Sequence, residues 1–211
     1  MTSRGVERFE IAGPAGTIEA VLDIPAAAPQ GIALVCHPHP LQGGTLDNKV
    51  AQTLARTFAK MGYAAARFNF RGVGQSAGTF AEGIGETDDA LAVLAHVRNR
   101  FGEALPIALA GFSFGSYVQT RVALRVHAEG LVLVGPAVNR FSIQHVQAGT
   151  VVVHGEEDDV VPLADVFAWA RPQQLPVVVF PGCGHFFHGR LPQLASVVTA
   201  MYPRGGHAGR P

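Results

Sequence analysis

The chain is poor in charge, in cysteine and in long apolar runs, and each shortage excludes a class of protein. Only 15% of its 211 residues are charged, and 16 basic and 16 acidic residues cancel to a formal net charge of zero. That balance offers no basic surface to nucleic acid or to an acidic membrane. No uninterrupted apolar stretch reaches the ~20 residues that a membrane-spanning helix needs. We therefore expect neither nucleic acid nor a membrane as a partner.

The cysteine content points to a reducing compartment. Cys36 and Cys183 are the two cysteines, one expected in a strand and the other in a loop. A pair placed in this way does not suggest a disulfide framework. The first eight residues also lack the apolar segment of a secretory signal peptide. We therefore expect a cytoplasmic protein.

The chain is otherwise rich in apolar residues, which make up 48% of it. This is expected of a sheet covered on both faces. The length fits a single domain over residues 1–211, in which we expect 203–211 to be a frayed tail. Alternating strand and helix patterns, with no repeat and no linker, predict an α/β fold whose sheet has eight strands, mostly parallel. The predicted strands are 6–11, 17–24, 32–36, 63–70, 106–110, 131–134, 151–155 and 177–180. The predicted helices are 47–61, 87–101, 116–126, 162–170 and 191–201.

One candidate nucleophile lies between a predicted strand and a predicted helix. Residues 111–115 read Gly-Phe-Ser-Phe-Gly, the G-x-S-x-G pattern of a nucleophile elbow, which lifts the serine hydroxyl clear of a sheet. Small residues flank such a serine because the backbone folds back on itself there. The free N–H groups of the following helix face developing negative charge. Ser113 is therefore the candidate nucleophile, and the alternative is an ordinary turn that contains a serine.

Two partners for Ser113 follow it along the chain. A group of carboxylates comes directly after the predicted strand 151–155, at the edge where open α/β sheets bind ligands: Glu156, Glu157, Asp158 and Asp159. The last predicted strand leads into a glycine-rich loop that carries His185. Serine, acid and histidine follow one another in this order in α/β-hydrolases. In such a triad the acid orients the histidine, which accepts the serine proton.

Several segments together resemble the α/β-hydrolases, and more narrowly the small bacterial serine hydrolases related to dienelactone hydrolases. The resemblance covers about residues 31–200 and rests on HPHPLQGG at 37–44, NFRGVGQS at 69–76, GFSFG at 111–115, HGEEDDVVP at 154–162 and GHFF at 184–187. It implies that the acid is Asp158, the Asp of H-G-x-x-D. Dienelactone hydrolases themselves use a cysteine nucleophile. Ser113 therefore favours serine-esterase chemistry over the opening of a lactone.

An oxyanion hole requires two backbone N–H groups. One is expected from Phe114, the residue after the nucleophile. The other is expected from the loop after strand 32–36. Because Pro38 and Pro40 have no N–H, that loop leaves His39 or Leu41 as the second donor.

The function predicted from these residues is hydrolysis of a small carboxylic ester or thioester through an acyl-enzyme, without a cofactor. Residues 135–150, where many α/β-hydrolases insert a lid, suffice only for a loop and one short helix. We therefore predict helices on both faces of the sheet, no lid domain and an open site. The alternatives are a peptidase or amidase that uses the same triad, and a non-catalytic binding module on a hydrolase scaffold.

Two further patterns suggest other kinds of site. His37 and His39, together with His185 and His188, could ligate a metal. Pro38 and Pro40 stiffen a loop that already has an expected oxyanion role, so His37 is interpreted as a structural histidine that anchors its loop, and we expect no metal.

The second pattern, Gly72-x-Gly74-x-x-Ala77, is similar to a dinucleotide-binding fingerprint. That fingerprint requires a helix at once, and residues 78–85 are loop-like instead. We interpret the segment as a turn in which Arg71 pairs with a nearby acid. The acids Asp88 and Asp89 are predicted at a helix start, where they suit the helix dipole.

Overall fold

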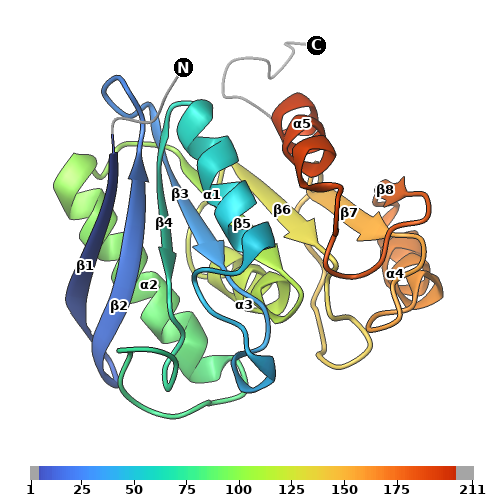
Figure 1. Ribbon diagram of the computed structural model, residues 1–211, viewed down its shortest axis with the longest axis horizontal. Helices are drawn as coiled ribbons and strands as arrows, with labels where there is room; N and C mark the ends of the chain where they lie inside the picture. The colour runs from blue at the N-terminus through green and yellow to red at the C-terminus, as the bar shows by residue number, and fades with distance from the viewer. Residues whose placement is uncertain (1–4, 203–211) are drawn as a thin grey trace.

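The computed structural model describes residues 5–202, whose strands form an eight-stranded sheet (Figure 1). The strands are β1 (Gly5–Gly13), β2 (Gly16–Ile24), β3 (Gly31–Cys36), β4 (Tyr63–Phe68), β5 (Ile107–Phe112), β6 (Gly130–Val134), β7 (Val151–Gly155) and β8 (Val177–Phe180). They lie in the order β1-β2-β4-β3-β5-β6-β7-β8. Both pairings of β2 are antiparallel and the others are parallel, so the predicted mostly parallel sheet is confirmed. The expected frayed tail lies outside the described residues.

Helices cover both faces of the sheet, as predicted (Figure 1). On one face lie α1 (Lys49–Lys60) and α5 (Leu191–Met201), and on the other lie α2 (Ile84–Phe101) and α3 (Phe114–Ala123). A fifth helix, α4 (Leu163–Ala170), packs against β7. None of the helices in residues 5–202 is both long and apolar enough to cross a bilayer.

Alternation along β3 shows how one strand supplies both cores. Ala33 and Val35 belong to the core under α1 and α5. Ile32, Leu34 and Cys36 belong to the core under α2 and α3. All five side chains are fully buried, as a parallel strand with both faces covered requires. β3 therefore lies in the interior of the domain, beside β5, whose end carries Ser113.

The segment between β6 and β7 contains no lid. Residues 135–150 form neither a helix nor a strand. One of its side chains, Phe141, packs on Phe114 and on Tyr117, with ring centroids 5.0 and 4.8 Å apart. The loop therefore forms part of the wall beside the candidate nucleophile, and the prediction of a lid-less fold is confirmed.

Helix α2 begins at Ile84, three residues before the predicted start. Gly83 precedes it with φ of 87°, a left-handed conformation that favours glycine. The carboxylate of Glu86 reaches back and accepts the N–H groups of Ala81 and Gly83, both at 2.8 Å. Glu86 thus supplies the carboxylate half of a capping box and satisfies donors at the helix start. The prediction that Asp88 and Asp89 begin the helix is therefore wrong.

Asp89 has a different role from the one predicted, because it holds the loop that precedes α2. Its two carboxylate oxygens each accept one hydrogen bond from the guanidinium of Arg71, both at 2.8 Å. The same guanidinium donates to the carbonyl of Gly85 at 2.8 Å. The expected pairing of Arg71 with an acid is confirmed, and it fixes the loop between β4 and α2 on the helix.

We expect Arg71→Met to lower the free energy of unfolding by about 3 kcal/mol, because it leaves the buried charge of Asp89 without a partner. Asp89 is 1% exposed. The matched control is Arg125→Met, since Arg125 and the neighbouring Asp88 are exposed and 3.9 Å apart. The free energy of unfolding of that variant should decrease by less than about 1 kcal/mol. Urea denaturation measures both, and equal losses would contradict the anchoring role of Arg71.

Candidate active site

Ser113 occupies a strained turn between β5 and α3. Its φ is 55° and its ψ is −118°, a combination that residues other than glycine rarely adopt. The turn is tight, because a Cβ on Gly111 would overlap the carbonyl of Gly115, and a Cβ on Gly115 would overlap the carbonyl of Cys36. Both glycines of the G-x-S-x-G pattern are therefore required by close backbone packing. The hydroxyl of Ser113 is thereby projected beyond the C-terminal edge of the sheet.

The three residues predicted as a triad lie in one hydrogen-bonded chain. Nε2 of His185 lies 3.1 Å from Oγ of Ser113. Nδ1 of the same ring lies 2.6 Å from Oδ2 of Asp158. The loop after β8 thus places His185 between the serine and the acid. This geometry allows the imidazole to accept a proton from the hydroxyl while the carboxylate stabilises the resulting charge.

The carboxylate of Asp158 is held from both sides. Its Oδ1 accepts the N–H groups of Val160 and Val161, at 3.0 and 2.7 Å. Burial disfavours ionisation and by itself raises the pKa of Asp158, but the hydrogen bonds from His185 and Val161 outweigh it and leave that pKa below its usual value. Asp158 is therefore ionised at neutral pH and fixed in one orientation.

His154 is a contact of Asp158 that the sequence reasoning did not identify. Its Nε2 lies 2.9 Å from the carbonyl of Val161 and 3.3 Å from Oδ2 of Asp158. Burial lowers the pKa of His154, so the ring is neutral at neutral pH and donates from Nε2. The available signal was a histidine that ends the apolar run of β7, four residues before the acid. The carboxylate that faces His185 thus has a second imidazole beside it.

The neighbouring carboxylates do not take part in this chain. Asp159 is exposed and contacts no residue of this chain of hydrogen bonds. Glu156 is also exposed and accepts the N–H of Gly182 at 2.9 Å. Cys183 is buried, which raises the pKa of its thiol and keeps it protonated. Of the four carboxylates after β7, Asp158 is therefore the one that contacts His185.

The loop after β3 distinguishes the two candidates for the second oxyanion donor. It contains a short 3-10 helix, η1 (Pro40–Gln42). The N–H of Leu41 is directed to Nδ1 of His39, at 3.2 Å. The N–H groups of His39 and of Phe114 donate to no other residue within 5–202. The side chain of Leu41 is 72% exposed, whereas the ring of His39 packs against Phe80 and Phe114 at 5.0 and 5.1 Å.

His37 anchors this loop, as predicted. Its Nδ1–H donates to the carbonyl of Pro38 at 2.7 Å, and its Nε2 accepts the N–H of Phe70 at 3.0 Å. Both ring nitrogens are thereby used, which leaves no lone pair for a metal ion. Burial lowers the pKa of His37 to about 3, so the ring is neutral at physiological pH.

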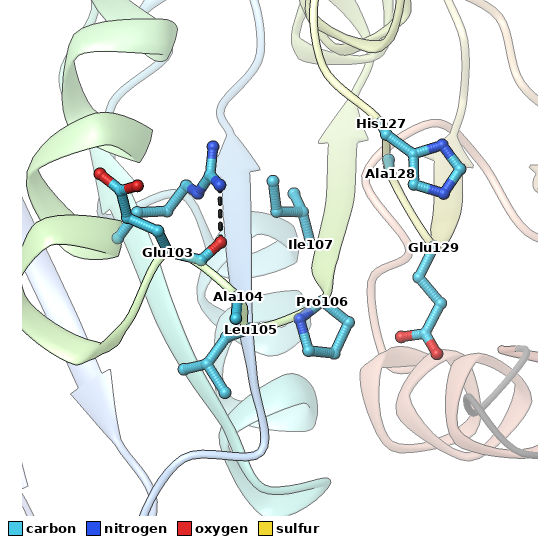
Figure 2. Close-up of a pocket in the computed structure, with 9 residues that line it drawn as sticks. Glu103, Ala104, Leu105, Pro106, Ile107, His127, Ala128 and Glu129 are labelled. Atoms are coloured by element: carbon cyan, nitrogen blue, oxygen red, sulfur yellow. Dashed lines mark hydrogen bonds between the residues drawn. The ribbon is translucent and has the colours of Figure 1, made fainter.

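Among the cavities of residues 5–202, one is lined by Ser113 and His185, a second shares lining residues with the first, and a third lies away from both. The catalytic pocket, about 100 Å³, is lined by Ser113 and His185 together with residues of the loop after β3 and with Phe186. A second cavity of about 430 Å³ opens beside it. The third, about 570 Å³, lies at the opposite edge of the sheet, where β5 and β6 begin (Figure 2). Its polar walls include Glu103, His127 and Glu129, and it contains no residue of the triad.

Comparison of the sequence and the fold with known proteins identifies a matching family model and similar solved structures. A family model described as serine aminopeptidase, S33, matches residues 29–142. An α/β serine hydrolase homologue from Coxiella burnetii is 39% identical, and the match covers 95% of this chain and 97% of that one with a TM-score of 0.86. A lid-less α/β serine hydrolase from Xanthomonas campestris is 34% identical over 98% of this chain and 99% of that one, with a TM-score of 0.88.

A sequence relative is found in Rickettsia prowazekii. It is an uncharacterised protein that is 32% identical over 161 residues, which are 73% of this chain and 68% of the relative. None of these three relatives is described as a dienelactone hydrolase. The narrower resemblance to that group therefore stays a prediction.

The buried, neutral His37 should make stability depend on pH. Its pKa is about 3 in the folded state, against an ordinary value of 6.5 that applies to the unfolded chain. The unfolded state therefore binds more protons, so the contribution of His37 is complete above pH 6.5 and decreases as the pH falls toward 3. From this group alone, the free energy of unfolding should decrease by about 2 kcal/mol between about pH 7 and pH 5.

Urea denaturation of the native chain and of His37→Gln at both pH values measures this contribution. Burial also lowers the pKa of His154, which adds to the total pH dependence, so the difference between the two proteins isolates His37. An unchanged pH dependence in His37→Gln would show that folding does not lower the pKa of His37.

Proposed function

We propose that this chain, which belongs to the α/β-hydrolase family described as serine aminopeptidase, S33, hydrolyses a small carboxylic ester or thioester through an acyl-enzyme. The observation that carries the proposal is the hydrogen-bonded chain from Ser113 through His185 to Asp158. A serine hydroxyl is a weak nucleophile until such a base accepts its proton. Membership of a family of hydrolases supports the same chemistry.

In the proposed mechanism Ser113 attacks the acyl carbon and His185 accepts the hydroxyl proton. Asp158 keeps the imidazole in the tautomer that presents Nε2 to the serine and stabilises the imidazolium that forms. His185 then gives the proton to the leaving group, and a water molecule releases the acyl group by the reverse sequence.

We assign the oxyanion hole to the backbone N–H groups of Phe114 and His39. The reason is that the N–H of Leu41 is already directed to the ring of His39. An N–H that is free of an internal acceptor can receive the charge that develops on the carbonyl oxygen. Packing of the His39 ring against Phe80 and Phe114 supports this assignment, because it restricts the orientation of the loop.

The family description makes an aminopeptidase the second candidate. An enzyme of that kind must bind the α-ammonium group of its substrate, for which a carboxylate is the natural partner. The described lining of the catalytic pocket contains no Asp or Glu. This composition favours an ester or thioester over a peptide. Labelling of Ser113 by a fluorophosphonate tests the remaining alternative, a non-catalytic binding module.

We further propose a small-molecule acyl substrate and a cytoplasmic location. The net charge of zero supports an uncharged or modestly charged partner over nucleic acid. Both cysteines, Cys36 and Cys183, are buried and unpaired, which suits a reducing compartment.

Ser113→Ala should lower kcat for a short-chain ester by about 10⁴–10⁶-fold, because it removes the nucleophile. Thermal unfolding should change little, since the hydroxyl makes no structural contact other than that with His185 among the described residues. Ser196→Ala, at an exposed serine of α5, is the matched control and should keep full activity. Near-native turnover by Ser113→Ala would refute the proposed mechanism.

Asp158→Asn should lower kcat by about 10⁴-fold, because an amide donates to the imidazole and selects the wrong tautomer. Asp159→Asn removes the neighbouring charge in the same loop, but Asp159 is exposed, so kcat should be nearly unchanged. Steady-state kinetics on both variants separates them. Comparable losses would mean that loop charge, and not the orientation of His185, is what matters.

A further inference from the structure

The catalytic pocket adjoins a larger cavity that has no role in the proposed mechanism. We call this space the side cavity, and it shares Gly43, Asn48 and Phe186 with the catalytic pocket. The side cavity measures about 430 Å³ and the catalytic pocket about 100 Å³. Small-molecule sites commonly measure ~300–1,000 Å³. The catalytic pocket alone therefore holds a small group, and the adjoining side cavity offers room for the rest of a substrate.

The position of the side cavity indicates which half of the substrate it receives. Its wall includes Phe186, His188 and Gly189, which closely follow His185 along the chain. In acyl transfer the histidine returns its proton to the leaving group, so the leaving group must lie on the histidine side of the scissile bond. The side cavity is thus suited to the leaving group, and the catalytic pocket to the acyl group.

The charges around the side cavity favour an anion. Lys49 lines it, is exposed, and forms no ion pair with a carboxylate in residues 5–202. Asp47 also lines it, but its carboxylate is bound by Arg67 at 3.0 Å and by Arg8 at 2.9 Å. Asp47 is therefore paired with two guanidinium groups, which also bind Glu19 and Asp23, whereas Lys49 pairs with no carboxylate in residues 5–202.

Polar groups accompany Lys49 on the same wall. Asn48 uses its Oδ1 to accept the N–H groups of Val50 and Ala51 at the start of α1. Its amide N–H₂ has no acceptor among the described residues and lies at the junction of the two cavities. Thr45 and His188 add further polar groups. An apolar alcohol would offer no acceptor to Lys49 or to the amide N–H₂ of Asn48, whereas an anionic group would.

We propose that the side cavity binds the leaving group, and that the substrate joins a short acyl group to a larger alcohol or thiol that carries a carboxylate or another anionic group. The inference rests on the proposed function, because it uses His185 as the acid. The bond from the acyl carbon to Oγ of Ser113 forms and the bond to the leaving oxygen or sulfur breaks. The serine proton passes through His185 to that atom, and water then regenerates Ser113 and releases the short acid.

The test uses two acetyl esters with leaving groups of similar size, 4-acetoxybenzoate and 4-acetoxybenzamide. Their kcat/KM values are divided by the rates of hydroxide-catalysed hydrolysis, which removes the difference in intrinsic reactivity. We expect the native enzyme to prefer the anionic ester by about fivefold, the upper end of what an exposed ion pair contributes. Lys49→Gln should reduce that ratio to about one.

The variant is expected to fold, because Lys49 is a cation at the N-terminal end of α1, where the helix dipole disfavours it. Lys60→Gln is the matched control. Lys60 is an exposed lysine at the other end of the same helix and does not line the side cavity, so both esters should be hydrolysed as by the native enzyme.

A third probe, monophenyl succinate, carries its carboxylate on the acyl side. If Lys49→Gln lowers kcat/KM for this probe and not for 4-acetoxybenzoate, the assignment of the side cavity to the leaving group is overturned. A ratio near one in the native enzyme, or a preference that survives Lys49→Gln, overturns the inference as well. In these cases hydrolysis still depends on Ser113. Hydrolysis that persists in Ser113→Ala instead marks a failure of the proposed function itself.

Discussion

The close approach of α3 to the end of β3 is the contact on which the rest of the site depends. Gly115, in the first turn of α3, packs so closely on the carbonyl groups of Cys36 and His37 that it leaves no room for a Cβ. Phe114 directly precedes Gly115, and His39 lies two residues after His37, so this packing joins the two segments that carry the proposed oxyanion donors. The proposed donors come from distant parts of the chain, and a rigid backbone contact between their segments is the kind of preorganisation that an oxyanion hole requires.

A chain with few charges uses several of them to fix the loops around this contact. Arg67, whose side chain is 5% exposed, donates to Asp23, to Asp47 and to the carbonyl of Leu46. It thereby ties the loop between β3 and α1 to β4. Arg71 does the same for the next loop through Asp89. Because a broken buried pair leaves an uncompensated charge, alternative loop positions are costly and the native one is well defined.

The parts of the site that depend on neighbouring residues in the sequence could be predicted. The strand, turn and helix around Ser113 and the order of serine, acid and histidine are local patterns, and the structure places these groups as they imply. The rest depends on side chains from separate elements. Our proposal of His39 over Leu41 as the second oxyanion donor rests on the contact of the Leu41 N–H with the His39 ring, which no spacing in the sequence encodes. The contact of His154 with Asp158 requires the turn after β7 to fold back over the strand.

Without a lid, the triad must be kept from bulk water by its own neighbours. Ser113 is 7% exposed and His185 is 3% exposed. The His185 ring packs against Phe112 and Phe186, with centroids 4.9 and 5.2 Å away, and a Cβ on Gly135 would come within 3.2 Å of it. The backbone of the segment that could have carried a lid is therefore itself packed against the catalytic ring. Phe112 is buried and Phe186 is 47% exposed, so Phe186 borders solvent at the junction of the catalytic pocket and the side cavity. In the proposed mechanism, a substrate that fills this junction would displace water from the His185 ring, and the electrostatic interactions among Ser113, His185 and Asp158 would then be stronger.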